Sequence, residues 1–219
     1  MKNLARSTSA ILLFLFWSCQ NNGKTTITLD DEFVGLIGYG SLISLQSMEE
    51  TLGHRYQYAS YLVHMDGFRR EWSDYSKIVE EEDGQSFFYL EGKDTISVDG
   101  IISLNIAPKE DYRINCVLYL VKREELVKFD ERESGYFRVD VTDKISDYQI
   151  KGSKVYTYES KTMIDPKESK ESYVITTEYN DLVNFACDSI GAEFRKEFDL
   201  TTIRPDSLIR IRSIIQRKQ

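Results

Sequence analysis

The chain of 219 residues has few of the residue types from which metal sites and nucleophilic triads are built. It contains two histidines, His54 and His64, and three cysteines, with no CxxC pair and no two histidines four residues apart. Because zinc and similar metals are held by clusters of such ligands, we expect no metal site. The shortage of histidine also argues against a Ser-His or Cys-His mechanism.

An excess of positive charge is absent as well. The sequence has 28 Lys and Arg against 36 Asp and Glu, a formal net charge of −8. Nucleic-acid binding depends on a basic face that neutralises phosphates. We therefore expect no nucleic-acid partner, and we interpret the basic residues over 210–218 as a solvated edge.

The apolar run near the N-terminus, residues 10–16, is too short to span a bilayer. It follows Lys2 and Arg6 and precedes Ser18 and Cys19, which is the arrangement of a signal peptide. A small residue before a cysteine at the end of such a run resembles a bacterial lipoprotein signal, in which the cysteine becomes the lipidated N-terminus. A cleaved secretory peptide and an uncleaved anchor are the alternatives.

This interpretation sets the predicted domain organisation. We expect a signal peptide over residues 1–18 with Cys19 as the lipidation site, a polar tether over 19–32 and one domain over 33–219. Loss of residues 1–18 leaves 26 basic and 36 acidic residues, a net charge of −10. The expected location is the bacterial cell envelope, where the lipid anchors the exported protein to the membrane.

Cys116 and Cys187 are the other two cysteines, and both lie in apolar runs. Export would permit a disulfide between them. Their spacing does not require one, and we expect two buried thiols.

The rest of the chain is predicted to contain more strands than helices. Runs rich in Tyr, Val, Ile and Leu between turn residues indicate strands, and apolar residues three and four apart indicate helices. The expected strands are 33–37, 56–65, 67–73, 86–90, 98–106, 114–121, 136–141 and 154–158. The expected helices are 43–52, 123–133 with Gly135 as its C-terminal cap, 173–190 and 192–198. Residues 80–84 are expected to form an acidic turn, 161–172 an exposed loop, and 208–215 a segment that could close the sheet. The pattern predicts one α+β domain.

The segment Gly38-Tyr39-Gly40-Ser41-Leu42 follows the first of these strands. Glycines two residues apart let the backbone turn sharply and leave N–H groups uncovered, so the loop can direct donors towards an anion or a carbonyl oxygen. A helix directly after it would also favour negative charge. The glycine spacing excludes a dinucleotide fingerprint and a nucleophile elbow around Ser41. The loop is therefore a binding loop or a plain strand-to-helix turn.

Glu133 is an acidic residue on an apolar helix face. Leu126, Phe129 and Glu133 are three and four residues apart in the predicted interior helix, so they share one side of it. Desolvation there and the nearby helix C-terminus both raise the pKa of a carboxyl group. Acid–base catalysis near neutral pH needs such a group. The alternative is a structural glutamate paired with an arginine such as Arg132 or Arg138.

Two segments together resemble the gamma-glutamylcyclotransferase-like superfamily. They are the strand leading into Tyr39-Gly40-Ser41-Leu42 and the downstream run Asp130-Glu131-Arg132-Glu133-Ser134-Gly135-Tyr136. The stretch Gly67-Phe68-Arg69-Arg70-Glu71-Trp72 is similar to the glycine-aromatic-x-arginine stretch of the ChaC-type branch. Tyr179 is similar to the tyrosine that opens the family's late helix. The resemblance covers residues 33–200.

The resemblance implies a small, mixed and mainly antiparallel barrel-like sheet flanked by helices. It also implies a pocket in which the loop Tyr39-Gly40-Ser41-Leu42 holds a gamma-glutamyl group through backbone N–H groups. Glu133 matches the family's catalytic glutamate, which carries a proton while the substrate's α-amine attacks its own γ-carbonyl. The products are 5-oxoproline and a free amine or amino acid, and no cofactor is needed. Tyr136 and Tyr179 are then expected to bind the substrate.

The chain departs from the ChaC-type branch, because the histidine- and glycine-containing motifs after the arginine stretch are missing. The resemblance therefore does not support glutathione as the substrate, and a gamma-glutamyl amino acid, peptide or amine is expected instead. Two other hypotheses stay open. One is a non-catalytic binding module for gamma-glutamyl or other carboxylate ligands on the same fold, and the other is a surface interaction protein whose pocket has decayed.

Overall fold

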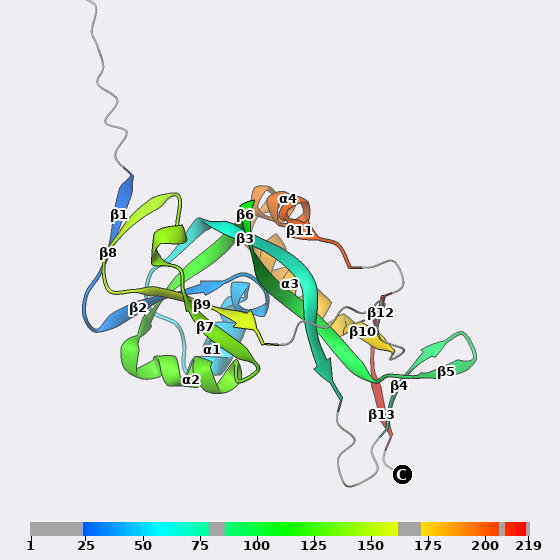
Figure 1. Ribbon diagram of the computed structural model, residues 1–219. Coiled ribbons are helices and arrows are strands. Elements are labelled where there is room, and N and C mark those ends of the chain that lie inside the picture. Colours follow the sequence, from blue (N-terminus) through cyan, green and yellow to red (C-terminus); the bar gives the residue numbers. More distant parts are fainter. Residues whose placement is uncertain (1–23, 79–85, 162–171, 206–208, 218–219) are drawn as a thin grey trace, which may run out of the picture.

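Two long strands form the antiparallel ladder around which the chain is arranged. They are β3 (Ser60–Lys77) and β6 (Gly100–Lys122), which pair along most of their length. The computed structural model describes residues 24–78, 86–161, 172–205 and 209–217 (Figure 1). Outside the described residues lie the predicted signal peptide (1–18), Cys19, the start of the tether, the acidic turn (80–84) and most of the loop 161–172.

Within the described residues, β3 and β6 belong to a mixed, mainly antiparallel sheet. Its strand order is β11-β3-β6-β2-β9-β7, and β10 joins it by pairing in parallel with both β6 and β12. The further strands of this sheet are β2 (Phe33–Gly38), β7 (Tyr136–Asp140), β9 (Val155–Ser160), β10 (Tyr173–Thr176), β11 (Thr202–Ile203) and β12 (Arg210–Arg212). Two smaller sheets consist of β1 (Thr25–Leu29) with β8 (Tyr148–Gly152), and of β13 (Ile215–Arg217), β4 (Ser86–Glu91) and β5 (Asp94–Ser97).

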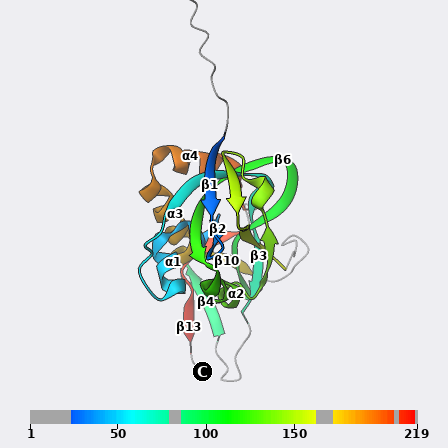
Figure 2. The ribbon, with the colours of Figure 1, turned by 90° about the vertical axis from the view of Figure 1, so that its left-hand side faces the viewer.

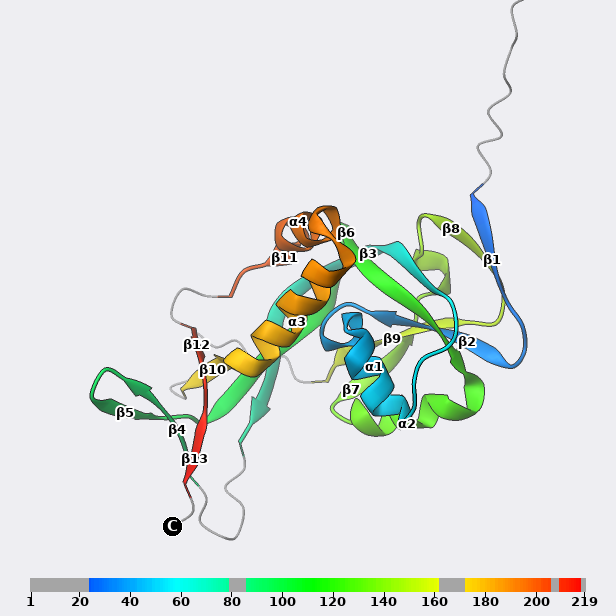
Figure 3. The same ribbon diagram turned by 180° about the vertical axis from the view of Figure 1, so that it is seen from behind.

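Helices flank this sheet. Helix α1 (Leu45–Leu52) contacts α2 (Leu126–Arg132), whereas α3 (Thr177–Ile190) contacts α4 (Ala192–Thr201), which also packs on β6 (Figure 3). The 3₁₀ turns are η1 (Ser41–Ile43), η2 (Arg123–Glu125) and η3 (Thr142–Lys144). Among the residues described, no helix combines the length and the apolar character needed to cross a membrane. The predicted α+β class and the mixed, mainly antiparallel sheet are confirmed.

Strand β3 joins two strands that the sequence analysis separates, 56–65 and 67–73. Gly67 lies between them and adopts a positive φ of 82°, which lets the strand bend without ending. A register shift against β6 between Asp66 and Phe68 marks the bend. The glycine is thus a bulge inside one strand.

Strand β6 likewise unites the predicted strands 98–106 and 114–121. Residues 109–113 between them are polar and exposed, which is the composition of a turn. Pairing with β3 on either side keeps the chain extended through this segment. Long-range pairing therefore overrides the local signal.

The predicted helix 173–190 begins four residues later than expected. Residues 173–176 form β10, and the Thr176 Oγ1 accepts a hydrogen bond from the Tyr179 N–H at 3.3 Å, so α3 starts at Thr177. Short apolar runs rich in β-branched residues suit a buried strand as well as a helix, and periodicity alone does not separate the two. On α3 the buried residues Val183, Ala186 and Cys187 form the expected apolar face.

The predicted polar tether over 19–32 is wrong in its second half. Residues Thr25–Leu29 form β1, which pairs in parallel with β8 and buries Ile27 and Leu29 (Figure 2). The alternation of these two apolar residues with threonines is the pattern of a half-buried strand. The folded domain therefore begins before residue 33.

Both cysteines of the domain are buried, and no disulfide joins them. Burial raises the pKa of the Cys116 thiol and that of the Cys187 thiol to about 12. The prediction of two buried thiols is confirmed.

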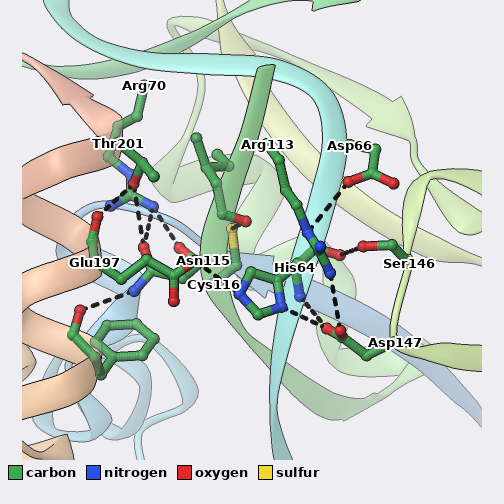
Figure 4. Close-up of polar contacts among 12 residues, drawn as sticks. His64, Asp66, Arg70, Arg113, Asn115, Cys116, Ser146, Asp147, Glu197 and Thr201 are labelled. Atoms are coloured by element: carbon green, nitrogen blue, oxygen red, sulfur yellow. Dashed lines mark hydrogen bonds and ion pairs between the residues drawn. The ribbon is translucent and has the colours of Figure 1, made fainter. Parts of the chain in front are cut away.

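A fully buried arginine, Arg70, links β3 to α4 and β11 (Figure 4). Its guanidinium donates hydrogen bonds to the backbone carbonyl and the side-chain oxygen of Asn115 and to the Thr202 hydroxyl, and lies 4.1 Å from the centre of the Phe198 ring. Asn115 in turn donates to the Phe194 carbonyl at 2.9 Å. Burial lowers the pKa of Arg70, so oxygen acceptors and the aromatic ring offset the desolvation of its charge.

His64 makes a second link between β3 and α4. Its Nδ1 lies 2.9 Å from an Asp147 carboxylate oxygen and its Nε2 lies 2.8 Å from Glu197 on α4 (Figure 4). Arg113 pairs with Asp147 on the other side, at 3.0 Å. This polar cluster holds α4 against the end of the ladder.

We predict that Arg70→Ala lowers the free energy of unfolding by about 3 kcal/mol, since it opens a cavity and removes the guanidinium donor from the buried Asn115 oxygens, of which the side-chain oxygen keeps only the longer hydrogen bond from the Thr201 hydroxyl, at 3.4 Å. Chemical denaturation followed by circular dichroism measures the change. Arg69→Ala is the matched control, because this neighbouring side chain is one-third exposed (34%) and its loss should cost about 1 kcal/mol or less. Equal losses in the two variants would contradict the role given to Arg70.

Candidate functional site

The segment Gly38-Tyr39-Gly40-Ser41-Leu42, called the glycine loop from here on, leaves β2 in a tight turn. A side chain at Gly38 would place its Cβ 2.2 Å from the Leu42 carbonyl oxygen, so glycine alone fits there. The Ile43 N–H donates to the Gly40 carbonyl at 2.9 Å and closes the turn. Helix α1 begins only at Leu45, and the Ser44 side chain caps it. The expectation that the helix starts directly after the loop, at residue 43, is therefore wrong: a 3₁₀ turn and Ser44 separate the loop from α1.

The hydroxyl group of Tyr179, on α3, lies against the backbone of the loop. Its oxygen accepts a hydrogen bond from the Leu104 N–H of β6 at 3.2 Å and faces the backbone of Ser41. A Cβ at Gly40 would lie 3.1 Å from this hydroxyl, so the glycine permits the close approach. The Trp72 ring meets the Tyr179 ring edge to face at 5.9 Å. Loop, helix and ladder are thus held together at one phenol.

Glu133 stands directly after the last residue of α2. It is the C-cap residue, with a backbone N–H bonded to the Phe129 carbonyl at 2.8 Å, and its side chain is 14% exposed. The predicted cap residue Gly135 does not have a positive φ, so the left-handed glycine cap is wrong. The predicted position of Glu133 at the end of this helix is confirmed.

Arg132 places Glu133 relative to the loop. Its guanidinium lies 3.0 Å from a Glu133 carboxylate oxygen and donates to the Ser41 hydroxyl, also at 3.0 Å. It further donates to the Ser47 carbonyl and the Thr51 hydroxyl of α1. The arginine pairing considered as an alternative is therefore present, and the same side chain also joins α1, α2 and the loop.

The pKa of Glu133 is nevertheless raised above its ordinary value of 4.5. Burial of the carboxyl group is the largest cause, the Arg132 guanidinium acts in the opposite direction, and the nearby Asp74 carboxylate adds to the rise. Tyr39 is buried close by, and burial followed by its neighbours Tyr179 and Glu133 raises its pKa as well. Glu133 thus combines a fixed position with an increased affinity for a proton.

Tyr136 begins β7, three residues after Glu133. Its hydroxyl donates to an Asp74 carboxylate oxygen at 2.6 Å, and the Ser160 hydroxyl donates to the other oxygen at 2.7 Å. Asp74 lies on β3 and is 6% exposed. This hydrogen-bonded group forms the wall behind Tyr136.

One pocket brings all of the proposed site residues together. The empty space between its walls, including the space at its mouth, is about 400 Å³. Its lining is formed by Ile37, Tyr39, Gly40, Ser41, Leu42, Ser103, Leu104, Glu133, Tyr136, Tyr158 and Tyr179. The seven residues singled out from the sequence as catalytic or substrate-binding are all among them. Their roles remain predictions, and their shared location is a fact of the fold.

Other residues of the site were not predicted from the sequence. Ser103, Leu104 and Tyr158 line the pocket from strands in which nothing distinguishes them from ordinary strand residues. Asp74 is an acid in a strand-like stretch, a signal that could have been found, but the predicted strand ended at residue 73. In the described part of the chain, no three His, Cys, Asp or Glu side chains are grouped so that they could hold a metal ion.

Comparisons with known proteins identify solved structures with a similar fold. The amino-acid sequence matches no protein-family profile and no curated protein. The structure is similar to a solved gamma-glutamyl cyclotransferase, with a TM-score of 0.51 and 11% sequence identity over 82% of this chain and 94% of the other. It is also similar to an uncharacterized human protein (TM-score 0.50, 12% identity, 80% and 91% covered) and to YkqA from Bacillus subtilis (TM-score 0.51, 12% identity, 77% and 53% covered).

These similarities define the class of the fold. The protein has a gamma-glutamyl cyclotransferase-like fold, as the two sequence segments predicted. At such low identity the likeness extends to the fold alone, so the activity has to be argued from the pocket.

The raised pKa of Glu133 has a consequence for stability. The folded protein holds this proton to a higher pH than the unfolded chain does, so the stabilisation from this group is complete below about pH 4.5 and is lost as the pH rises through the folded pKa. We predict that the difference in unfolding free energy between wild type and Glu133→Gln shifts in favour of the variant between about pH 4 and about pH 8. Denaturant titrations of both proteins across this range measure the shift.

Arg132→Gln serves as the comparison in that experiment, because it removes the charge that lowers the pKa of Glu133. In this background the change with pH should be larger. A constant difference, or a shift in favour of wild type, would mean that the ion pair with Arg132 outweighs burial.

Proposed function

We propose that the protein is a gamma-glutamylcyclotransferase that releases 5-oxoproline from a gamma-glutamyl amino acid, peptide or amine. The observation that carries the proposal is the position of Glu133, a largely buried acid with a raised pKa that faces a glycine loop across one small pocket. A pure binding site for an anionic ligand gains little from such an acid, whereas a reaction that moves a proton requires one.

The proposed reaction starts with the substrate's gamma-glutamyl end in the pocket. Glu133 takes a proton from the α-ammonium, and the free amine attacks the γ-carbonyl carbon of the same molecule. Glu133 then gives this proton to the leaving nitrogen and takes up the second proton that the attacking nitrogen loses. The bond to the leaving nitrogen breaks, and the departing amine carries the second proton away as an ammonium, so Glu133 is ionised again. Because the attack is intramolecular, the pocket has only to hold one folded conformer of the substrate and to carry protons from the attacking nitrogen to the leaving one.

Stabilisation of the oxyanion falls to the loop. The attacked γ-carbonyl oxygen gains negative charge, and the donors that we assign to it are backbone N–H groups of the segment Tyr39-Gly40-Ser41-Leu42, which lines the pocket. Loss of one such donor typically costs roughly 3 kcal/mol of transition-state stabilisation. Arg132 holds Ser41 and Glu133 on either side of the pocket and so keeps the distance between donor loop and proton carrier constant.

The second candidate is a binding module on the same fold. The ion pair between Arg132 and Glu133 favours it, since a paired carboxylate also suits a purely structural role. The two functions differ in one measurable result, the appearance of 5-oxoproline.

We predict that Glu133→Gln lowers the rate of 5-oxoproline release at least about 100-fold, because the amide cannot accept the ammonium proton. The assay incubates purified protein with gamma-glutamyl amino acids, gamma-glutamyl amines and glutathione and quantifies 5-oxoproline by mass spectrometry. Glu131→Gln is the matched control, since this exposed glutamate of the same helix lies outside the pocket and its loss should leave the rate unchanged.

Two other results would change the assignment. Equal turnover by wild type and Glu133→Gln would refute the role of Glu133. No turnover with any compound, together with saturable binding of one of them, would favour the binding module.

We further propose that the protein is an exported lipoprotein anchored to the membrane through Cys19. The support is the sequence alone, namely the basic start, the short apolar run and the small residue before the cysteine. An anchored enzyme would meet gamma-glutamyl compounds outside the cytoplasmic membrane.

For this anchor we predict that Cys19→Ala abolishes incorporation of labelled palmitate in a bacterial host and moves the protein from the membrane to the soluble fraction. Export without label in wild type would indicate a cleaved secretory peptide. Membrane retention of both proteins without label would indicate an uncleaved anchor.

A further inference from the structure

Asp74 is a buried carboxylate next to the pocket that the proposed reaction does not use. It is 6% exposed, and among the described residues no lysine or arginine forms an ion pair with it. Its partners are two hydroxyl groups, those of Tyr136 and Ser160. A buried acid held only by neutral donors is costly, so its position calls for a function.

A β-bulge places Asp74 there. Trp72 pairs with Leu104, but Asp74 pairs with Ser103, so Ser73 is an extra residue in β3. Side chains alternate between the faces of a strand, and without the extra residue Trp72 and Asp74 would share one face. The bulge instead turns Asp74 to the face of Ser103, which lines the pocket.

The hydrogen bond to Asp74 fixes the direction of the Tyr136 hydroxyl. A carboxylate only accepts hydrogen bonds, and a phenol has one proton to donate. That proton points to Asp74 at 2.6 Å, so the lone pairs of the Tyr136 oxygen are left for the pocket. Burial, and then the neighbouring Tyr39 and Asp74, raise the pKa of Tyr136, which keeps the proton in place.

Tyr179 has the opposite polarity. Its oxygen accepts from the Leu104 N–H and faces the backbone of Ser41, so its own proton is free to point into the pocket. The pocket therefore holds one tyrosine that can accept from a ligand and one that can donate to it. Asp74 lies beside the acceptor, and Glu133, which interacts with Asp74, lines the same pocket.

We propose that Asp74 is a positioning residue that makes Tyr136 a hydrogen-bond acceptor for the α-ammonium group of a gamma-glutamyl substrate. The inference rests on the proposed function and adds to it the recognition of the substrate's α-ammonium group. Tyr136 holds the ammonium while Glu133 removes its proton, and it then holds the amine during attack. Tyr179 donates to a substrate oxygen instead.

The test compares two ligands that differ only in the amino group. Gamma-glutamyl-alanine carries the α-ammonium, and glutaryl-alanine lacks it. Isothermal titration calorimetry measures the dissociation constants of both ligands in the Glu133→Gln background, where turnover does not interfere. We expect the preference for the gamma-glutamyl ligand to fall at least about tenfold in Asp74→Asn, because the asparagine amide can donate to Tyr136 and reverse its hydroxyl.

Three further variants separate this role from a structural one. Tyr136→Phe should lose the same preference, and Asp74→Asn should add nothing in the Tyr136→Phe background. Tyr179→Phe should weaken both ligands equally, because it binds a group that they share. Glu159→Gln removes a charge close to Tyr39 without contacting Tyr136 and should leave the preference unchanged.

The outcomes distinguish this inference from the proposed function. Turnover by wild type with an unchanged ligand preference in Asp74→Asn refutes the role of Asp74 alone. If Asp74→Asn lowers the preference for the gamma-glutamyl ligand even in the Tyr136→Phe background, Asp74 does not act through the tyrosine. This result also refutes the role of Asp74 as a positioning residue. No 5-oxoproline from wild type and no binding of either ligand to Glu133→Gln overturns the proposed function and this inference together.

Discussion

The arrangement of the pocket depends on one guanidinium group. Arg132 reaches from the end of α2 to the Ser41 hydroxyl, to two oxygens of α1 and to the carboxylate of Glu133. Each contact alone is a modest, partly exposed interaction. Together they join the loop over residues 39–42 to Glu133. These two segments are far apart in the sequence, with a separation of 91 positions between Ser41 and Arg132. Because this group also opposes the rise in the pKa of Glu133, the same side chain sets both the position and the proton affinity of the acid.

The ladder of β3 and β6 is the second constraint. Leu104 of β6 donates its N–H to Tyr179, and Trp72 of β3 packs on the ring of that tyrosine. The bulge one residue further along turns Asp74 towards Tyr136. The second register shift of this ladder thus sets where the buried carboxylate of Asp74 lies relative to the pocket.

Local sequence predicts those parts of the site whose chemistry is local. The glycines of the loop and the acid on an apolar helix face are visible in short windows, and the structure places both at one pocket. Asp74 is visible as an acid in a strand-like stretch, but its position next to the pocket depends on the register shift between Asp74 and Ser103, about thirty residues apart in the chain, which no short window contains. The fold errors have the same origin: Gly67 and residues 109–113 look like turns until β3 and β6 pair across them. Strand β1 was not predicted, because its pairing partner β8 was not recognised in the sequence either.

The polarity of the tyrosines bears on the choice between an enzyme and a binding module. A site that merely holds a carboxylate needs donors, for which the proposal assigns Tyr179 and the backbone N–H groups of the loop over residues 39–42, all of which line the pocket. Such a site has no use for Glu133 and Asp74, whose charges repel an anion. Both acids suit a ligand that is positive at one end and must lose a proton there. A γ-glutamyl group has such an ammonium beside its α-carboxylate, and the carbon that its amine attacks lies in the same molecule. The acids therefore favour catalysis over storage of the ligand.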